Sequence, residues 1–503
     1  MVNVLTGLGA VVTPSALLWN LIGVVIGIVF GALPGLTATQ AVAIFTPLTF
    51  VMPFTISMSF LLGIYCGGYY GGAITAILLR TPGAPGNAAT CMDGYPMAQK
   101  GQAGKALAIA VMASWLGGEL SALALMVGAP ALSLIALRFG PPEYFAIGLL
   151  GLVCVAGISE GNILKGVAGG LAGMLLATIG MDPISGRPRF TLGIQGLMAG
   201  VALIPALVGL FAITEVLAKA EQMELGKKDQ LITEYDIALP TKREWWESRW
   251  TLLKGTIIGV IVGVLPGTGP TIASWMSYQE AKRSSKHPEL FGTGITEGVM
   301  ATEVANNAVT GGALIPLLTL GVPGDSVTAV LLGSLMIQGL TPGPLLIRNN
   351  PALVSQLFWI LIIANAFMLA IGLGAARAFP QILRIPMRIL LPIICVLCIV
   401  GSYAVNNSLF DVWMVVLIGF VGFVASKFGF QVAPIVLGFI LGPIIEPNFR
   451  RALITSGGSP LVFVTRPFSL GILILAGLLL AFILYRQRSG GVAGEAVKEP
   501  DMA

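Results

Sequence analysis

Long apolar runs alternate with short polar or Gly-Pro-rich segments along almost the whole chain. The first 79 residues contain no charged side chain, and Arg80 is the first. Because a membrane-crossing helix needs about 20 consecutive apolar residues, each long run is a candidate span. Such runs recur from Leu17 to Tyr485, which predicts about ten to twelve crossings or part-crossings.

The composition assigns these runs to a membrane rather than to a soluble core. Of the 503 residues, 56% are hydrophobic and 10% are charged, and the mean hydropathy is +0.90. Soluble domains carry about 25% charged residues. In lipid the backbone has to satisfy its own hydrogen bonds, which favours helices. We therefore predict an all-α polytopic membrane protein. The net charge of +5 indicates cytoplasmic loops rather than nucleic-acid binding.

Two motifs recur in the same order. Three glycines four residues apart lead to Pro34-Gly35, and the same pattern leads to Pro266-Gly267, 232 residues later. A glycine pair followed by Pro82-Gly83 returns as a glycine pair followed by Pro323-Gly324. The alternative is chance, because small residues at this spacing are common in packed membrane helices. We predict a duplicated fold.

The polarity of the chain sets the predicted boundaries. Residues 1–218 form a first transmembrane repeat, 219–250 a cytoplasmic linker, 251–488 a second repeat and 489–503 a disordered cytoplasmic tail. Basic residues flank the second Pro-Gly motif on both sides and the first on neither. By the positive-inside rule the two motifs then enter from opposite faces. This predicts inverted-topology repeats with re-entrant hairpins and broken helices, a plan of secondary transporters.

Proline and glycine interrupt the apolar runs at four places. The interruptions lie at residues 33–40, 81–87, 265–271 and 321–326. Lipid cannot face such a break, so it is buried in protein or lines a wet cavity. The N-terminus of the helix that follows suits a carboxylate, and unwound carbonyls and hydroxyls hold a small cation. The alternative is that the breaks only kink packed helices and the threonines bond local backbone.

The breaks supply the candidate site residues. For the substrate we expect Pro34, Gly35, Thr37, Thr39, Pro266, Gly267, Thr268 and Thr271, together with Asn306 and Asn307. We expect Gly83, Asn87, Gly324, Asp325 and Ser326 to bind the ion or to support the binding residues. Glu303 shares a helix face with the two asparagines, since i, i+3 and i+4 are neighbours. It fits a cavity and a cytoplasmic helix end equally well.

In combination the motifs resemble the large membrane subunit (TctA-like permease) of tripartite tricarboxylate transporters, over nearly the whole chain. The motifs are Gly31-x-Leu-Pro-Gly35, Tyr69-Tyr-Gly-Gly72 through Thr81-Pro-Gly83, Asp93-Gly-Tyr-Pro96, Phe139-Gly-Pro-Pro-Glu-Tyr144, Glu303-x-x-Asn-Asn307, Gly321-Val-Pro-Gly324 and Leu441-Gly-Pro443 to Arg450-Arg451. The resemblance implies a small four-helix membrane partner, a periplasmic solute-binding protein and location in a bacterial inner membrane. Paired hairpins also resemble elevator-type carboxylate carriers, an analogy of fold alone.

The expected function is import of a di- or tricarboxylate driven by an ion gradient. No phosphate-binding G-x-x-x-x-G-K-[ST] run is present, so we expect no ATPase, and we expect neither a cofactor nor a resident metal. The coupling ion remains open between Na⁺ and H⁺. An anion channel is the nearer alternative. An intramembrane enzyme is disfavoured, because His287 lies in a basic loop and Asp325 lacks a clear partner aspartate.

Overall fold

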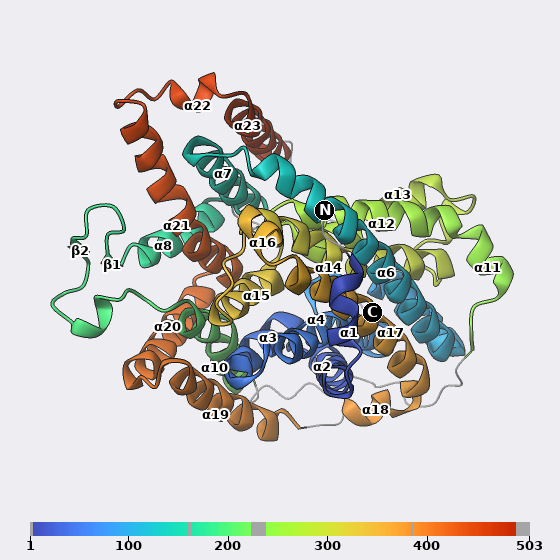
Figure 1. Ribbon diagram of the computed structural model, residues 1–503. Helices are drawn as coiled ribbons and strands as arrows, with labels where there is room; N and C mark the ends of the chain where they lie inside the picture. Colours follow the sequence, from blue (N-terminus) through green and yellow to red (C-terminus); the bar gives the residue numbers. More distant parts are fainter. Residues whose placement is uncertain (1–3, 159–162, 223–237, 384–385, 489–503) are drawn as a thin grey trace.

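The computed structural model describes residues 4–158, 163–222, 238–383 and 386–488 (Figure 1). The regular structure in these ranges is almost entirely helical, with one short antiparallel pair, β1 (Gly180–Met181) and β2 (Pro188–Arg189). Residues 223–237 of the predicted linker and the whole predicted tail (489–503) lie outside the described residues.

The helices fall on either side of the linker. Before it lie α1 (Leu8–Val11), α2 (Pro14–Ala32), α3 (Ala38–Phe45), α4 (Phe54–Leu79), α5 (Cys91–Met97), α6 (Ala103–Ala136), α7 (Pro141–Ile158), α8 (Ile163–Ala177), α9 (Leu203–Leu207) and α10 (Thr214–Gln222), with the short turns η1 (Val4–Gly7), η2 (Thr46–Val51), η3 (Pro85–Asn87), η4 (Ala98–Gln102), η5 (Gln195–Leu197) and η6 (Val208–Ile213). After it lie α11 (Lys242–Glu247), α12 (Arg249–Val264), α13 (Gly269–Ser284), α14 (Thr296–Leu320), α15 (Ser326–Ile337), α16 (Pro344–Asn349), α17 (Pro351–Gly374), α18 (Phe379–Ile382), α19 (Met387–Asn406), α20 (Leu409–Lys427), α21 (Val432–Thr455), α22 (Val462–Thr465) and α23 (Pro467–Arg488), with η8 (Pro288–Leu290) and η9 (Ala376–Ala378).

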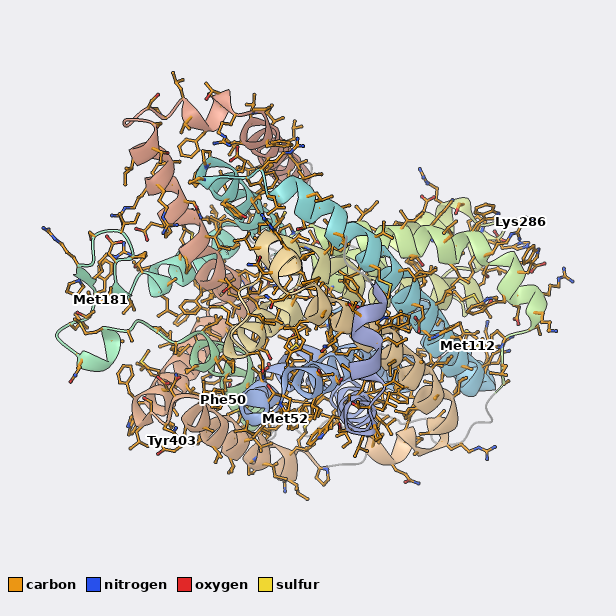
Figure 2. All side chains as sticks on the ribbon, viewed as in Figure 1. Phe50, Met52, Met112, Met181, Lys286 and Tyr403 are labelled. Atoms are coloured by element: carbon orange, nitrogen blue, oxygen red, sulfur yellow. The ribbon has the colours of Figure 1, made fainter. Side chains whose placement is uncertain are left out.

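The helices confirm an all-α polytopic membrane protein. Eight helical stretches in the described ranges are long and apolar enough to cross a membrane, and five further apolar stretches are shorter. Large apolar side chains also cover the outside, as expected of a surface that faces lipid. Phe50 and Tyr403 are 44% and 42% exposed, and Tyr403 lies near the lower left edge of the molecule in Figure 2.

The helices form a central group and a lateral group. In the centre α2 packs on α4, α12 packs on α14, and α14 also packs on α6, which in turn contacts α17. To the left in Figure 1, α21 packs on α7 and α8, and α20 packs on η6 and α10. Because α4 and α14 are buried along most of their length, their polar side chains face other protein groups and not lipid.

The repeated glycines pack in the same way in both halves. A Cβ atom at Gly27 would lie 2.8 Å from the amide nitrogen of Gly68 on α4, and one at Gly259 would lie 2.5 Å from the carbonyl oxygen of Ala305 on α14. Real Cβ atoms essentially never come so close to backbone. The glycines therefore let α2 approach α4, and α12 approach α14, at backbone contact distance. This equivalence supports the predicted duplication.

A second correspondence lies in the lateral group. Glu215 and Lys219 on α10 form an i, i+4 pair at 3.9 Å, and Glu446 and Arg450 on α21 form another at 3.1 Å. Arg450 also bonds both carboxylate oxygens of Asp182, at 2.8 and 3.0 Å, in the loop that carries β1 and β2. The hydrogen bond from Arg450 holds the pKa of Asp182 below its usual range.

Replacing Asp182 by asparagine is expected to lower the thermal stability of the full chain in detergent at neutral pH. Because the folded-state pKa is depressed, the stabilisation is fully present above the unfolded value of about 3.9 and is lost as the pH falls through the folded value. Melting temperatures of both proteins as a function of pH check this. A difference that does not shrink in acid would contradict it, and Glu289→Gln, at an exposed glutamate, serves as the control.

Candidate functional site at the helix breaks

The structure confirms the four predicted helix breaks, and it places them in matched pairs. The first pair follows α2 and α12: both helices end in an extended residue, and the glycines of the Pro-Gly motifs, Gly35 and Gly267, have φ values of 81° and 80°. The second pair follows α4 and α14, where Arg80 and Gly321 adopt left-handed φ values of 58° and 72°. Left-handed backbone commonly ends helices and favours glycine.

The second break of each half folds back onto the first. Gly83 lies against the carbonyl oxygen of Gly31, and Gly324 lies against that of Gly263, so closely that neither position has room for a Cβ atom. The Gly267 amide also donates to the Gly324 carbonyl oxygen at 2.8 Å. The predicted residues Gly83 and Gly324 therefore hold the breaks together through close backbone contact.

Asp325 connects the second half to the first. It caps α15, where its Oδ1 accepts hydrogen bonds from the amide and hydroxyl of Thr328, both at 2.7 Å. Its Oδ2 accepts hydrogen bonds from the hydroxyl of Tyr65, at 2.6 Å, and from that of Tyr69, both on α4. Asp325 is 1% exposed. Both of its oxygens are thus occupied by protein donors.

Glu303 makes the reciprocal connection from α14 to the break of the first half. It is fully buried, which excludes a place at a solvated helix end. Its Oε1 accepts hydrogen bonds from the Thr90 hydroxyl at 2.5 Å and the Asn87 amide at 3.1 Å, and its Oε2 accepts one from the Ser114 hydroxyl on α6 at 3.1 Å. The second break of each half is therefore bonded to a helix of the opposite half.

The carbonyl oxygen of Tyr69 links the hydrogen bonds around Asp325 with those around Glu303. It accepts hydrogen bonds from the side-chain amides of Asn87, at 3.2 Å, and Asn306, at 3.1 Å. Since the Asn87 amide nitrogen donates to two oxygens, its own Oδ1 is the atom left over, and this buried oxygen has no partner in the described structure. Both amide atoms of Asn307 are likewise buried and unpaired there. Unpaired buried amides are costly and call for an explanation.

The predicted threonines lie at the first breaks and bond their own chain. Thr37 caps α3 in a reciprocal capping box with Gln40, and the Thr268 hydroxyl donates to the carbonyl oxygens of Val262 and Leu265. Thr39 and Thr271 are half-buried, as are Pro34, Gly35 and Ser326, whereas Pro266 and Gly267 are buried. The structure thus brings Asn87, Asn306 and Asp325 together at the centre and leaves the threonines at its margin.

The first break also meets the lateral group. The ammonium of Lys219 on α10 lies directly over Gly35. A small pocket lies beside it, lined by Leu36, Gln40, Ile44, Ala212, Glu215, Val216 and Ile394. The lining is mainly apolar, and Glu215 is its one charged side chain.

Sequence reasoning missed four groups of the centre. Tyr65, Tyr69, Thr90 and Ser114 all contact a buried carboxylate. Tyr65 and Tyr69 share a helix face because they are four residues apart, and that spacing within an apolar run is a signal that was available. Ser114 stands alone among alanines and glycines, where small polar residues commonly serve packing.

A multi-pass helical membrane protein whose broken helices meet at a buried polar centre has the architecture of a transport protein. The chain belongs to the tripartite tricarboxylate transporter TctA family, whose model matches residues 17–437.

Two proteins of Agrobacterium vitis are similar. The "uncharacterized 52.8 kDa protein in TAR-I ttuC' 3'region" is 40% identical over 94% of this chain and 93% of its own length. The "uncharacterized protein in TAR-II ttuC' 3'region" is 41% identical over 43% of this chain and 89% of its own length. No solved structure matches the chain.

Proposed function

We propose that the chain is the transmembrane carrier of a tripartite system that imports a di- or tricarboxylate across a bacterial inner membrane. It works with a small four-helix membrane subunit and a periplasmic solute-binding protein that delivers the substrate. An ion gradient, and not an ATPase, drives the import. Membership of the TctA family supports the general assignment. The observation that carries the carrier mechanism is the reciprocal bonding of the second helix break of each half to a helix of the opposite half.

The geometry suits a carboxylate substrate held near the breaks. The amide of Asn307 is buried without a partner, and Asn306 on the same face reaches the opposite half. Helices α3 and α15 both begin at breaks and direct the positive ends of their dipoles toward them. Amide donors together with helix N-termini are the groups that bind carboxylates without a buried basic residue.

The cross-half bonds also suit a site that changes its access. A carrier opens its site to one side of the membrane and then to the other, by moving one bundle relative to another. The breaks of the two halves are joined by individual hydrogen bonds at Asp325, Glu303 and the Tyr69 carbonyl. A few such bonds can exchange with substrate or solvent, whereas the close glycine contacts of α2 with α4, of α12 with α14 and of α6 with α14 keep the helices around the breaks rigid.

Reconstituted transport tests this proposal. We expect the chain, together with its partner subunits in proteoliposomes, to take up labelled citrate or succinate in a saturable way and to show counterflow when the inside is preloaded. Imposed Na⁺ and pH gradients are applied separately. Flux that rises linearly with concentration and shows no counterflow would establish a channel and contradict the carrier.

Removing the hydroxyl of Thr37 or Thr268 is expected to lower uptake several-fold while the protein still inserts. Thr37→Ala removes a helix cap worth about 1 kcal/mol, and Thr268→Ala leaves two carbonyl oxygens at the end of α12 without that donor. Thr455→Ala is the matched control, because this hydroxyl also bonds its own helix but lies far along α21. Normal uptake in both variants at matched expression would remove the first breaks from the site.

A further inference from the structure

The two buried carboxyl groups of the centre have different surroundings. Asp325 caps α15, so the partial positive charge of a helix N-terminus faces it, and four donor groups contact its oxygens. Glu303 lies in the interior of α14, and its Oε1 contacts the hydroxyl of Thr90, the N-cap residue of the short helix α5. Its hydrogen bonds in the described structure come from side chains, whereas Asp325 also accepts one from the Thr328 backbone amide. The environment therefore compensates a negative charge on Asp325 more fully than one on Glu303.

No basic side chain compensates Glu303 either, within the part of the chain that the structure describes. None of the ion pairs formed there includes it. The titratable and charged side chains on the elements that pack against α14 are Tyr65, Cys66, Tyr69 and Tyr70 on α4; Cys91, Asp93 and Tyr95 on α5; Lys105 and Glu119 on α6; Arg249 and Lys254 on α12; Tyr278, Glu280, Lys282 and Arg283 on α13; and Arg348 on α16.

Several groups of this set are engaged elsewhere. Lys105 pairs with Glu244, and Lys254 and Arg283 pair with Glu280. Asp93 accepts hydrogen bonds from the Tyr278 hydroxyl and from three backbone amides. An ionised carboxylate in a dry interior without a positive partner is strongly disfavoured. Glu303 therefore needs a proton or a cation during at least part of its working cycle.

The hydroxyl groups around Glu303 fit a proton. The Thr90 hydroxyl lies 2.5 Å from Glu303 Oε1 and 3.0 Å from the Thr302 hydroxyl, and it has one hydrogen to give to either. The Thr302 hydroxyl in turn donates to the Val299 carbonyl oxygen at 3.0 Å. When Glu303 is ionised, Thr90 donates to it. When Glu303 is protonated, its O–H donates to Thr90, and Thr90 turns to donate to Thr302.

The same three groups thus satisfy both protonation states by rotation of one hydroxyl. We propose that Glu303 is the group that binds and releases the coupling proton of the carrier, with Thr90 as the hydroxyl that turns between Glu303 and Thr302. This rests on the proposed transport function. The proton comes from water on one side of the membrane, forms an O–H bond on the carboxylate, and leaves to water on the other side.

The hydrogen bonds around Glu303 provide a route by which its protonation affects the proposed substrate site. The Asn87 amide donates both to Glu303 and to the Tyr69 carbonyl oxygen, and the Asn306 amide shares that carbonyl. Protonation of Glu303 weakens its acceptance of the Asn87 bond. The change then reaches both residues 82–90 and the amide of Asn306. The charge on Glu303 is thereby linked to the side of α14 that faces the proposed substrate site.

Infrared difference spectra of the full chain in lipid, recorded between alkaline and acidic pH, test proton binding without any substrate. We expect a protonated-carboxyl band that disappears in Glu303→Gln. The band should remain in Glu119→Gln, which removes a partly buried acid of α6 outside this network. In Thr90→Val the band should change frequency, because its hydrogen-bond partner is gone. A spectrum of Glu303→Gln identical to the parent would overturn the proposal.

Transport of labelled citrate gives the second arm. In Glu303→Gln we expect uptake driven by a pH gradient to fall at least about tenfold, and the remaining uptake to lose its dependence on that gradient, because a neutral side chain cannot bind and release the proton. Uptake that responds to a Na⁺ gradient and not to a pH gradient would overturn the proposal that a proton is the coupling ion. A titrating Glu303 band without carboxylate transport refutes the proposed function alone. If Glu303→Gln does not fold, the infrared spectrum of Thr90→Val tests the proposal. A carboxyl band at an unchanged frequency would overturn it.

Discussion

Replacing Gly27 or Gly259 by leucine is expected to prevent the accumulation of folded protein. A side chain at either position would meet the backbone of the neighbouring helix, and backbone cannot turn away as a flexible side chain does. Overpacking usually costs about 1–3 kcal/mol, and a clash with fixed backbone in two interlocked helices belongs at or above the upper end. The yield of monodisperse protein after extraction in detergent, with its melting temperature, measures the effect.

Gly477→Leu is the matched control. Gly477 lies on the apolar helix α23, and nothing lies within 4 Å of the position of an added Cβ atom. This variant should therefore accumulate and melt like the parent protein. If Gly27→Leu also did so, the close approach of α2 and α4 would be wrong, and the equivalence of the two halves would lose its main support.

Asp325→Ala is expected to abolish uptake, with a loss of at least about tenfold, and to destabilise the chain. The substitution removes the acceptor of the Tyr65 and Tyr69 hydroxyls and of the Thr328 amide. Each buried donor left unpaired costs about 1–3 kcal/mol, so the total is about 3 kcal/mol or more. Melting temperature and citrate uptake at matched expression measure the two effects.

Asp411→Ala separates the loss of a buried acid from the loss of this particular one. Asp411 is also nearly buried and lies in the first turn of α20, but its hydrogen bonds to Ser408 and Asn406 are local. We expect a modest loss of stability and unchanged uptake. Equal uptake in Asp325→Ala and the parent protein would show that the contact between the second break and α4 has no part in transport.

The breaks were predictable from sequence because their causes are local. Proline lacks an amide hydrogen and glycine permits left-handed backbone, so the Pro-Gly motifs marked where α2, α4, α12 and α14 end. Their recurrence also indicated that the halves correspond. Gly35 and Gly267, with almost equal positive φ values, show that the correspondence extends to backbone conformation.

The contacts between the breaks were not predictable, because they join residues far apart in sequence. Tyr65 and Asp325 are 260 positions apart, and Asn87 and Glu303 are 216 apart. Helical spacing identifies residues on one face, but it does not say which other helix covers that face. For the same reason the sequence could not show whether Glu303 lies in a cavity or at a helix end. Its hydrogen bonds with Asn87 and Thr90 place it in the interior.

The threonines that follow the first breaks differ, because their hydrogen-bond partners are local. A hydroxyl after a Pro-Gly break looks like a ligand in sequence, yet Thr37 and Thr268 first satisfy the orphan backbone groups that the break creates. Their role in binding substrate stays a prediction. The buried amide of Asn306 is better placed, because it donates to the Tyr69 carbonyl oxygen where the two halves meet.

A structure of the chain with the proposed partner subunits and the proposed carboxylate substrate tests the central claim most directly. The account predicts that the carboxylate oxygens lie within hydrogen-bond distance of Asn306 or Asn307, between the breaks at residues 81–87 and 321–326. A carboxylate bound elsewhere, with the hydrogen bonds of Asp325 and Glu303 unchanged, would contradict it.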